Sequence, residues 1–223
     1  MSYKIVIPVH NEAKNVSKLI DRFSRRHLSS IIMVDDGSTD KTSEIIKEKY
    51  PEVEVLRHKI NLGKGKSLET GTLKAIKEKT DIIIFMDGDL QHKPEDINRF
   101  LRAFKKDKDL DILFGARKIG RTMRLIAFIG NKILTIIINI FFRYFLNDTQ
   151  CGFRAIRSRA FNKIRWTSPG YSAETEMIIN AAKHKLKYKE IPIDTIYLDY
   201  YKGTYIFDGL VIMTKILLWK LLK

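Results

Sequence analysis

The chain has 223 residues, 44% of them hydrophobic, so it can bury one substantial core, and a single domain over residues 1–223 is expected rather than a disordered chain. Its one cysteine, Cys151, excludes an internal disulfide, and the first residues show no signal peptide, which together predict a reducing, cytoplasmic compartment. The net charge is +15, and residues 121–223 carry 17 basic against 7 acidic side chains, a bias that suits nucleic acid, anionic lipid or a phosphorylated substrate without choosing among them.

Short β-branched segments alternate with longer amphipathic ones through the first half of the chain. We expect strands at "YKIVIPV", "SIIMVDD", "VEVLRH", "DIIIFMD" and "LDILFGAR". The segments between them predict helices at residues 12–26, 41–49, 64–79 and 94–106. Apolar strands that alternate with helices are typical of a parallel sheet covered on both faces, which is the layered α/β architecture.

The segment that begins at Arg121, "RTMRLIAFIGNKILTIIINIFFRYFL", has about the length of a membrane span but is interrupted by polar residues. On a helix these would form one stripe against a broad apolar face: Asn131, Thr135, Asn139 and Arg143. We expect a helix at about 121–146 that lies in a lipid interface, with packing in the core as the alternative. The apolar, lysine-bearing segment 205–223 is expected to lie there too, or to dock on the domain.

Acidic side chains follow two of the expected strands. Ligands of an open α/β sheet bind beyond the carboxyl ends of its strands, where Asp36 and the pair Asp87 and Asp89 are expected. Carboxylates this close repel one another unless a cation or hydrogen-bond donors bind among them. The pair flanks one glycine, so it can converge on Mg²⁺ or Mn²⁺ together with a substrate diphosphate, and an ordinary Asp-Gly turn is the structural alternative.

The stretch "VDDGSTDKT" combines capping residues with two extra acids. Ser38 or Asp40 can cap the helix that follows. Asp35 and Asp36 exceed what capping needs, and carboxylates at a strand end can accept hydrogen bonds from a nucleotide base or a ribose hydroxyl, as Glu12 could.

The stretch "NLGKGKS" resembles a phosphate-binding loop but has Ile60 where that motif requires glycine. Lys64 and Lys66 at a helix start can still attract an anion, and a solvated lysine turn is the equal alternative. The five histidines show no spacing suited to a metal site, and Cys151 is expected to be a small buried side chain.

Eight ordered motifs together carry a family resemblance: "IPVHNE", "VDDGSTD", "NLGKGKS", "MDGDLQ", "FGAR", "DTQCGFR", "AETEM" and "IPI". In this order they resemble the family 2 glycosyltransferases of GT-A fold, most closely the dolichyl-phosphate mannose synthase and polyprenyl-phosphate glycosyltransferase branch. The resemblance covers nearly the whole chain and implies a Rossmann-like, mostly parallel sheet. It also implies a nucleotide-sugar half at 1–120 and an acceptor half at 121–223.

The activity that this resemblance implies is inverting, metal-dependent sugar transfer. The sugar, mannose ahead of glucose, would pass from a nucleotide sugar such as GDP-mannose to dolichyl or polyprenyl phosphate at the cytoplasmic face of a membrane. Many relatives carry added transmembrane helices that this sequence does not show.

The resemblance also implies roles for individual residues. Those expected to bind the nucleotide sugar are Pro8, His10, Glu12, Val34, Asp36, Lys64, Asp87 and Gly88. Asp87, Asp89 and Gln91 would hold Mg²⁺ or Mn²⁺, and Arg117, Arg124 and Lys202 would bind the acceptor phosphate. Asp89, Arg117 and Glu176 would be catalytic. The motif "DTQCGFR" departs from the family's D-x-T-S-G-F-R pattern at Gln150 and Cys151.

A phosphate acceptor fits the basic second half of the chain. A phosphate monoester, with a second pKa of about 6, is already anionic near neutral pH and needs no strong base to attack. Three alternatives remain. A family member that acts on a sugar hydroxyl would need Glu176 as a base. A sugar-nucleotide pyrophosphorylase would need a glycine-rich loop after "IVIPV", which is missing. A non-enzymatic binder of membrane or nucleic acid would suit the charge, but no nucleic-acid motif accompanies it.

Overall fold

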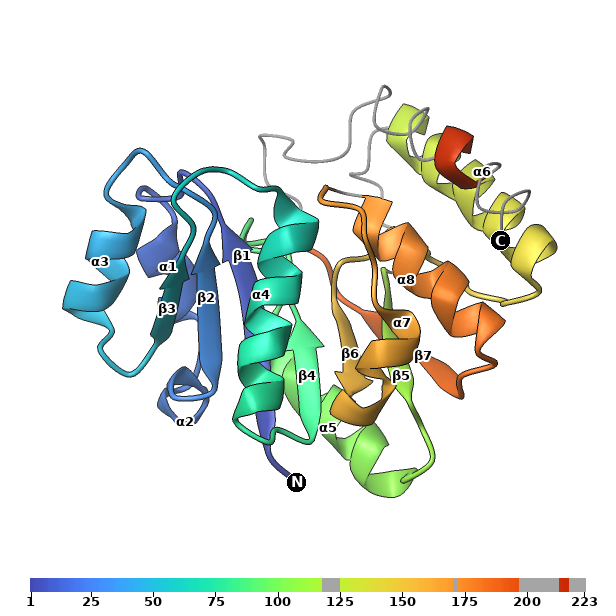
Figure 1. Cartoon of the computed structure of the whole chain (residues 1–223), viewed down its shortest axis with the longest axis horizontal. Helices are drawn as coiled ribbons and strands as arrows, with labels where there is room; N and C mark the ends of the chain where they lie inside the picture. Colours follow the sequence, from blue (N-terminus) through green and yellow to red (C-terminus); the bar gives the residue numbers. More distant parts are fainter. Residues whose placement is uncertain (118–124, 171, 197–212, 217–223) are drawn as a thin grey trace.

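The computed structural model describes residues 1–117, 125–170, 172–196 and 213–216. These residues form a central sheet of seven strands in the order β3-β2-β1-β4-β6-β5-β7 (Figure 1). The strands are β1 Tyr3–Val9, β2 Ile31–Asp35, β3 Glu54–Arg57, β4 Ile82–Phe85, β5 Ile112–Arg117, β6 Arg154–Arg157 and β7 Tyr188–Ile193. The five strands expected from the first half of the sequence are all present.

The sheet is mostly parallel, as expected, with one exception. β6 is antiparallel to both of its neighbours, β4 and β5, whereas the other pairs are parallel. Because β6 begins where its neighbours end, the loop before it reaches the edge of the sheet that carries their carboxyl ends. This insertion brings the segment "DTQCGFR" to that edge.

The helices lie on both faces of the sheet. They are α1 Val16–Asp21, α2 Arg25–Leu28, α3 Thr42–Lys49, α4 Lys64–Lys77, α5 Ile97–Lys106, α6 Leu125–Phe142, α7 Phe161–Ile164 and α8 Ser172–Lys183, with single 3₁₀ turns at Pro94–Asp96 and Ser158–Ala160. The single helix expected at residues 12–26 is wrong. Ser24, with φ −65° and ψ 147°, leaves the helical region and separates α1 from α2, while Phe23 turns into the core.

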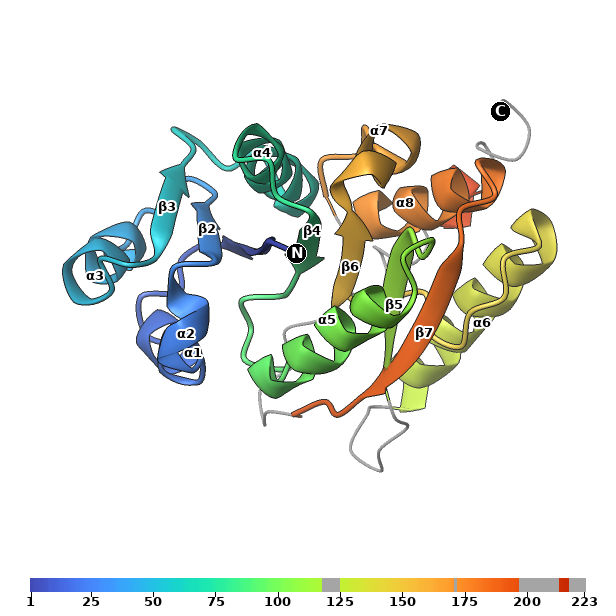
Figure 2. The same cartoon turned by 90° about the horizontal axis from the view of Figure 1, so that it is seen from below.

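Two apolar layers hold the helices on the sheet, as the alternation along β1 shows. Val6 packs in one cluster with residues of α4, α6, α7 and α8, whereas Ile5 and Ile7 pack in the other with residues of α1, α3 and α5 (Figure 2). All three are fully buried. Each such side chain contributes about 1.5–3 kcal/mol through burial, so the strands are fixed from both sides.

The helix α6 packs on α8 and turns Thr135 and Asn139 of its polar stripe toward the domain, whereas Arg143 lies beyond the helix end and is exposed. Leu134 and Ile138 are buried in the core, and Thr135 beside them is only 4% exposed. The outward face carries an apolar stripe instead: Ile129, Ile133, Ile136 and Ile140, which are 44–65% exposed. The polar side chains face the domain because backbone groups of the following loop bind them.

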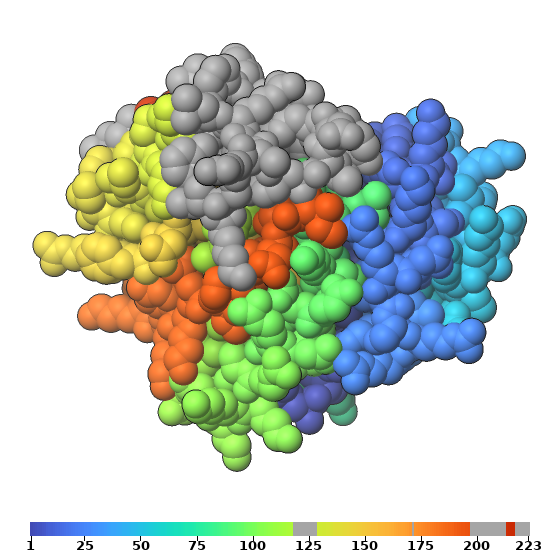
Figure 3. Space-filling view, turned by 180° about the vertical axis from the view of Figure 1, so that it is seen from behind, coloured from blue at the N-terminus to red at the C-terminus, as the bar shows by residue number. Residues whose placement is uncertain are grey.

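The space-filling view shows α6, in yellow, at the end of the molecule opposite to α3, in light blue (Figure 3). Among the described residues, no helix combines the length and the apolar character needed to cross a bilayer. The expected helix at 205–223 lies outside the described residues except for 213–216, which are helical.

Candidate functional site

The carboxyl ends of the parallel strands form the edge of the sheet that is uppermost in Figure 1, and five of the predicted site residues lie at or just after these strand ends. His10 follows β1, Asp36 follows β2, Asp87 and Asp89 follow β4, and Arg117 ends β5. Parallel strands end at the same edge, so their following loops lie together even though they are far apart in the chain.

Asp87 lies in an ion-pair cluster with a lysine from α4 and a glutamate from α8. The Nζ of Lys64 lies 2.5 Å from Oδ1 of Asp87 and 2.7 Å from Oε1 of Glu174. Burial alone would raise the pKa of Asp87, but Lys64, followed by His92 and Arg117, lowers it to about 2. Burial would lower the pKa of Lys64, but the two carboxylates raise it. The cluster therefore keeps a fixed cation beside an ionised carboxylate.

Asp89 has the opposite electrostatics although it is only two residues away. Burial raises its pKa to about 7, helped by the negative charge of Asp87 and more weakly by Glu12. The backbone N–H of Gln91 donates to its Oδ1 over 3.0 Å and offsets part of this effect. Burial and the charge of Asp87 thus destabilise the ionised form of Asp89. A cation bound to its carboxylate would stabilise that form.

The donor set fits a metal ion that shares its coordination with a substrate. Asp87 and Asp89 provide two carboxylates, and the described residues contain no group of three or more protein side chains arranged as a metal site. Mg²⁺ is commonly held by one or two carboxylates plus substrate phosphates, which is what this pair offers. Gln91 contributes its backbone N–H to Asp89, and its carbonyl accepts a 2.9 Å hydrogen bond from Ile196 N–H.

The loop before β6 packs directly against Asp87 because it contains Gly152. A Cβ atom at this glycine would lie 2.3 Å from Oδ2 of Asp87, so no larger residue fits without displacing the carboxylate. On the other side, the backbone N–H of Asp87 donates to Nδ1 of His92 over 3.3 Å. Burial lowers the pKa of His92 to about 4, so this ring is neutral near pH 7, and it stacks on Phe153.

Arg117 is held in place by Asp148 from the same loop. Its Nε donates to Oδ2 of Asp148 over 2.6 Å and its Nη2 to Oδ1 over 3.0 Å, while its backbone N–H also donates to Oδ2 over 3.2 Å. Burial would raise the pKa of Asp148, but Arg117 lowers it. A forked pair of this kind fixes the plane of the guanidinium.

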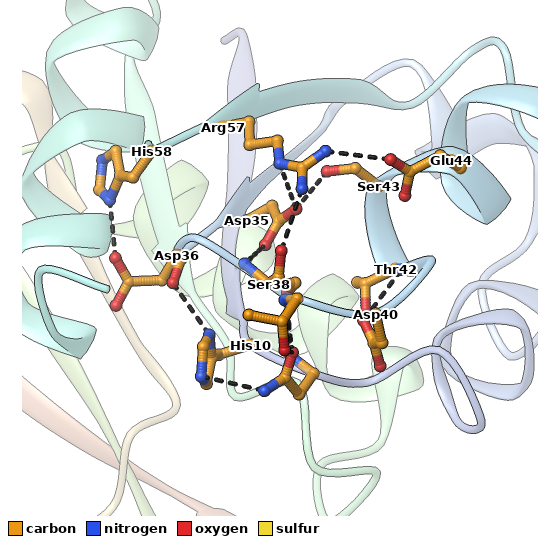
Figure 4. Close-up of polar contacts among 12 residues, drawn as sticks. His10, Asp35, Asp36, Ser38, Asp40, Thr42, Ser43, Glu44, Arg57 and His58 are labelled. Carbon is orange, nitrogen blue, oxygen red and sulfur yellow. Dashed lines mark hydrogen bonds and ion pairs between the residues drawn. The ribbon is translucent and has the colours of Figure 1, made fainter. Parts of the chain in front are cut away.

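Asp36 is tied to the loop that leads into α4. Its carboxylate accepts hydrogen bonds from the backbone N–H groups of Leu62 and Gly63, over 2.9 and 2.7 Å, and pairs with Nδ1 of His58 at 2.7 Å (Figure 4). The expected base-contacting residue thus positions the loop before Lys64. His10, also expected at the nucleotide, contacts the carbonyl of Asp36 through Nδ1 at 2.9 Å.

Asp35 has a structural role, so the hypothesis that its carboxylate accepts hydrogen bonds from a nucleotide is wrong. It is fully buried and accepts from the backbone N–H of Ser38 over 2.9 Å and from the hydroxyl of Ser43 (Figure 4). The Nε of Arg57 lies 3.4 Å from its Oδ2. These contacts hold the turn between β2 and α3.

Glu176, expected to be catalytic, lies 1% exposed beneath a neighbouring loop. Its Oε2 accepts hydrogen bonds from the backbone N–H groups of Thr167 and Ser168, over 3.0 and 2.9 Å, and its Oε1 from the hydroxyl of Thr167. The helix α8 instead sends Glu174 to the site, a residue that the sequence analysis missed. Residues two positions apart on a helix point in directions about 200° apart, so only one of these two glutamates can face Lys64. The sequence carries no signal that shows which of them does.

We expect Glu176→Gln to retain sugar transfer within about threefold of the unsubstituted protein and to lower the free energy of unfolding by about 1 kcal/mol, since it weakens the hydrogen bonds that the carboxylate accepts from Thr167 and Ser168. The matched variant Glu174→Gln should lower transfer more strongly, because it loosens Lys64. Near-complete loss in Glu176→Gln with nucleotide binding intact would contradict this placement and favour a general base.

Of the remaining residues predicted to bind the nucleotide sugar, three lie at the edge of the sheet and one lies in the core. Pro8, Glu12 and Gly88 lie at the same edge: a Cβ on Gly88 would come within 2.9 Å of the carbonyl of Pro8, and Glu12 is close enough to influence Asp89. Val34 is fully buried in the core, so its side chain is not available to a nucleotide. Cys151 is 1% exposed, as expected, and burial raises its pKa to about 12.

Two expected acceptor-phosphate residues, Arg124 and Lys202, lie outside the described residues. Arg117 is therefore the member of that set whose surroundings the structure describes.

Comparisons with known proteins agree on a family. A family model described as glycosyl transferase family 2 matches residues 4–165. An uncharacterized protein of Methanocaldococcus jannaschii is 37% identical over 97% of this chain and 91% of its own length. A UDP-N-acetylglucosamine–dolichyl-phosphate N-acetylglucosaminyltransferase of Methanococcus voltae is 31% identical over 98% of this chain and 96% of its own length.

The fold also matches solved structures. A glucosyl-3-phosphoglycerate synthase from Mycobacterium tuberculosis, solved in complex with Mg²⁺ and UDP, superposes with a TM-score of 0.76 over 98% of this chain and 79% of its own. The two sequences are 18% identical, so this likeness concerns the GT-A fold.

Proposed function

The chain belongs to glycosyl transferase family 2, and from this premise we propose that it transfers a sugar from a nucleotide sugar to dolichyl or polyprenyl phosphate at a membrane surface. One observation carries the proposal. The acidic pair Asp87 and Asp89 and the cation Arg117 lie at one edge of the sheet, beside a helix whose outer face is apolar. That combination suits a diphosphate donor, a phosphate acceptor and a lipid tail.

For the donor, we propose a uridine-diphosphate sugar, with N-acetylglucosamine first. The support is the full-length similarity to the Methanococcus voltae enzyme, whose name specifies that sugar and dolichyl phosphate. Mannose and glucose, which the sequence resemblance favoured in that order, stay predictions and belong in the same test.

The donor diphosphate would meet both a metal ion and a lysine. A divalent cation bound to Asp87 and Asp89 would offset the charge that develops on the departing nucleoside diphosphate. Lys64, held next to Asp87, adds a second positive charge at the same place. Asp36 fixes the backbone of the loop just before Lys64 and so helps to aim it.

The acceptor phosphate would meet Arg117. A phosphate monoester is largely anionic near neutral pH, since its second pKa is about 6, so it can attack the anomeric carbon without a protein base. This agrees with the engagement of the Glu176 carboxylate by backbone N–H groups. Asp148 orients the guanidinium of Arg117, which would offset repulsion between the two phosphorylated reactants.

The outer stripe of α6 is the proposed lipid contact. Its four isoleucines would enter the interface, and the excess of basic residues in the second half of the chain would favour an anionic surface. Ile137 and Phe141, which also belong to the apolar side in the sequence, are only partly exposed and pack against the core.

We expect the double replacement of Ile136 and Ile140 by serine to weaken binding to anionic phospholipid vesicles by at least about tenfold, because it removes apolar area that would be buried in lipid. Nucleotide affinity should stay unchanged. The measurement is vesicle sedimentation, with Leu73→Ser as the matched control, since Leu73 is 44% exposed on α4. An equal loss in the control, or none in the double variant, would contradict the assignment of this face.

The function itself is tested by an extraction assay. The protein is incubated with polyprenyl phosphate, Mg²⁺ or Mn²⁺ and labelled UDP-N-acetylglucosamine, UDP-glucose or GDP-mannose, and the mixture is partitioned into organic solvent. We expect label in the lipid phase with one donor and its loss when EDTA replaces the metal. If no donor labels the lipid, the proposed function is wrong.

A further inference from the structure

The inner side of α6 is fastened to the loop formed by residues 146–149. The side chain of Asn139 makes two hydrogen bonds with Leu146: its Nδ2 donates to the carbonyl over 2.8 Å, and its Oδ1 accepts from the backbone N–H over 3.1 Å. One turn earlier, the hydroxyl of Thr135 lies 3.0 Å from that of Thr149 and accepts from the Thr149 backbone N–H over 3.4 Å. These contacts give hydrogen-bond partners to backbone groups of the loop.

The loop is also held from the opposite side, by the last strand of the sheet. Oε1 of Glu190 on β7 accepts hydrogen bonds from the backbone N–H groups of Asn147 and Asp148, over 2.8 and 3.3 Å. Asp148 lies between these two attachments and points its carboxylate at Arg117. Its position therefore depends on α6 as well as on β7.

We propose that Thr135 and Asn139 are positioning residues of the acceptor-phosphate site, which hold the 146–149 loop so that Asp148 aims the guanidinium of Arg117. The inference rests on the proposed function, in which Arg117 meets the acceptor phosphate. It gives α6 two roles on opposite faces: the outer stripe contacts lipid and the inner polar pair orients the residue that binds the phosphate. The helix α6 and the 146–149 loop then connect the lipid contact to the phosphate site.

The first test separates acceptor recognition from donor recognition. Asn139→Leu and Thr135→Val keep the size of each side chain but remove its hydrogen bonds to the loop. Each should raise the KM for polyprenyl phosphate by about tenfold, because a small misplacement of a positioning group is costly. The KM for the nucleotide sugar should not change. Asn131→Leu is the matched control, since the side chain of Asn131, on the same helix, makes no hydrogen bond within the described part of the chain.

A double-mutant cycle shows whether the effect passes through Asp148. In the Asp148→Asn background, Arg117 has already lost the charge of Asp148, so adding Asn139→Leu should raise the KM for the acceptor no further. If the second substitution instead has its full effect in that background, Asn139 acts through general stability and the proposal is overturned.

Hydrogen exchange of the Arg117 amide tests the connection without any turnover. This N–H donates to Asp148 over 3.2 Å, so Asn139→Leu should speed its exchange relative to the unsubstituted protein and to Asn131→Leu. If Asn139→Leu leaves the exchange rate of the Arg117 amide unchanged, the proposal is overturned, whatever the transfer activity of the variant. Faster exchange in a protein that labels no lipid would support the positioning role and refute the proposed function, so the two failures are distinguishable.

Discussion

Asp89→Asn is expected to lower sugar transfer by about a thousandfold, the largest effect of any single replacement considered. Asparagine keeps the shape of the side chain and can still accept the hydrogen bond from Gln91. What it removes is the charge that, with Asp87, would bind a divalent cation beside the donor diphosphate. The extraction assay with the preferred donor measures the loss, and Asp109→Asn, at an exposed position, is the control.

The same variant should be more stable, which separates lost function from lost folding. The pKa of Asp89 is about 7 in the folded protein and about 3.9 in an unfolded chain. A raised carboxyl pKa costs stability progressively as the pH rises from about 4 through about 7, because the folded state holds the proton more tightly. In EDTA, Asp89→Asn should therefore unfold at a higher temperature than the unsubstituted protein at pH 8 and at nearly the same temperature at pH 4. Retained transfer, or lower stability at pH 8, would contradict the assigned role.

Gly152→Ala is expected to reduce transfer by roughly a hundredfold, since displacement of a reacting group by about an ångström has effects of this size. The added methyl would overlap the carboxylate of Asp87, its nearest atom lying 2.3 Å away, so Asp87 must move from its place between Lys64 and the loop. The affinity for nucleoside diphosphate with Mg²⁺, measured by calorimetry, should fall with the rate.

The control for this variant is Gly130→Ala on α6, where an added Cβ meets nothing within 4 Å. Alanine is favoured over glycine in a helix by about 1 kcal/mol, so the control should be active and no less stable. If Gly152→Ala binds nucleotide and transfers sugar normally, the loop can retreat from Asp87 and the close packing there has no functional consequence.

The central sheet could be predicted from the sequence because its signals are local. Strands such as "DIIIFMD" are apolar over four or more residues, and the acids after them must then lie at the carboxyl edge. This reasoning placed Asp87, Asp89 and Arg117 correctly at one edge. It could not reveal β6, since a four-residue strand that includes the buried Arg154 shows no apolar run.

The features that the sequence did not reveal depend on tertiary contacts between different elements of the fold. The period of four in α6 shows that Thr135 and Asn139 share a face, but only the loop at 146–149 decides which way that face turns. In the same way, Glu174 rather than Glu176 reaches the site because Lys64, on another helix, is its partner. Asp36 stays a predicted nucleotide contact, but the sequence could not show that its carboxylate also accepts hydrogen bonds from the backbone of the 62–63 turn.

The insertion of β6 between β4 and β5 fixes the distance between these two strands. Asp87 follows β4 and Arg117 ends β5, and these two strands lie two strand spacings apart, about 10 Å measured across the sheet. Hydrogen bonds of the sheet set the interval between these two strands. If donor diphosphate and acceptor phosphate bind at its two ends, the sheet itself sets how far apart the reactants are held, and adaptation to a larger or smaller sugar must come from the loop between them.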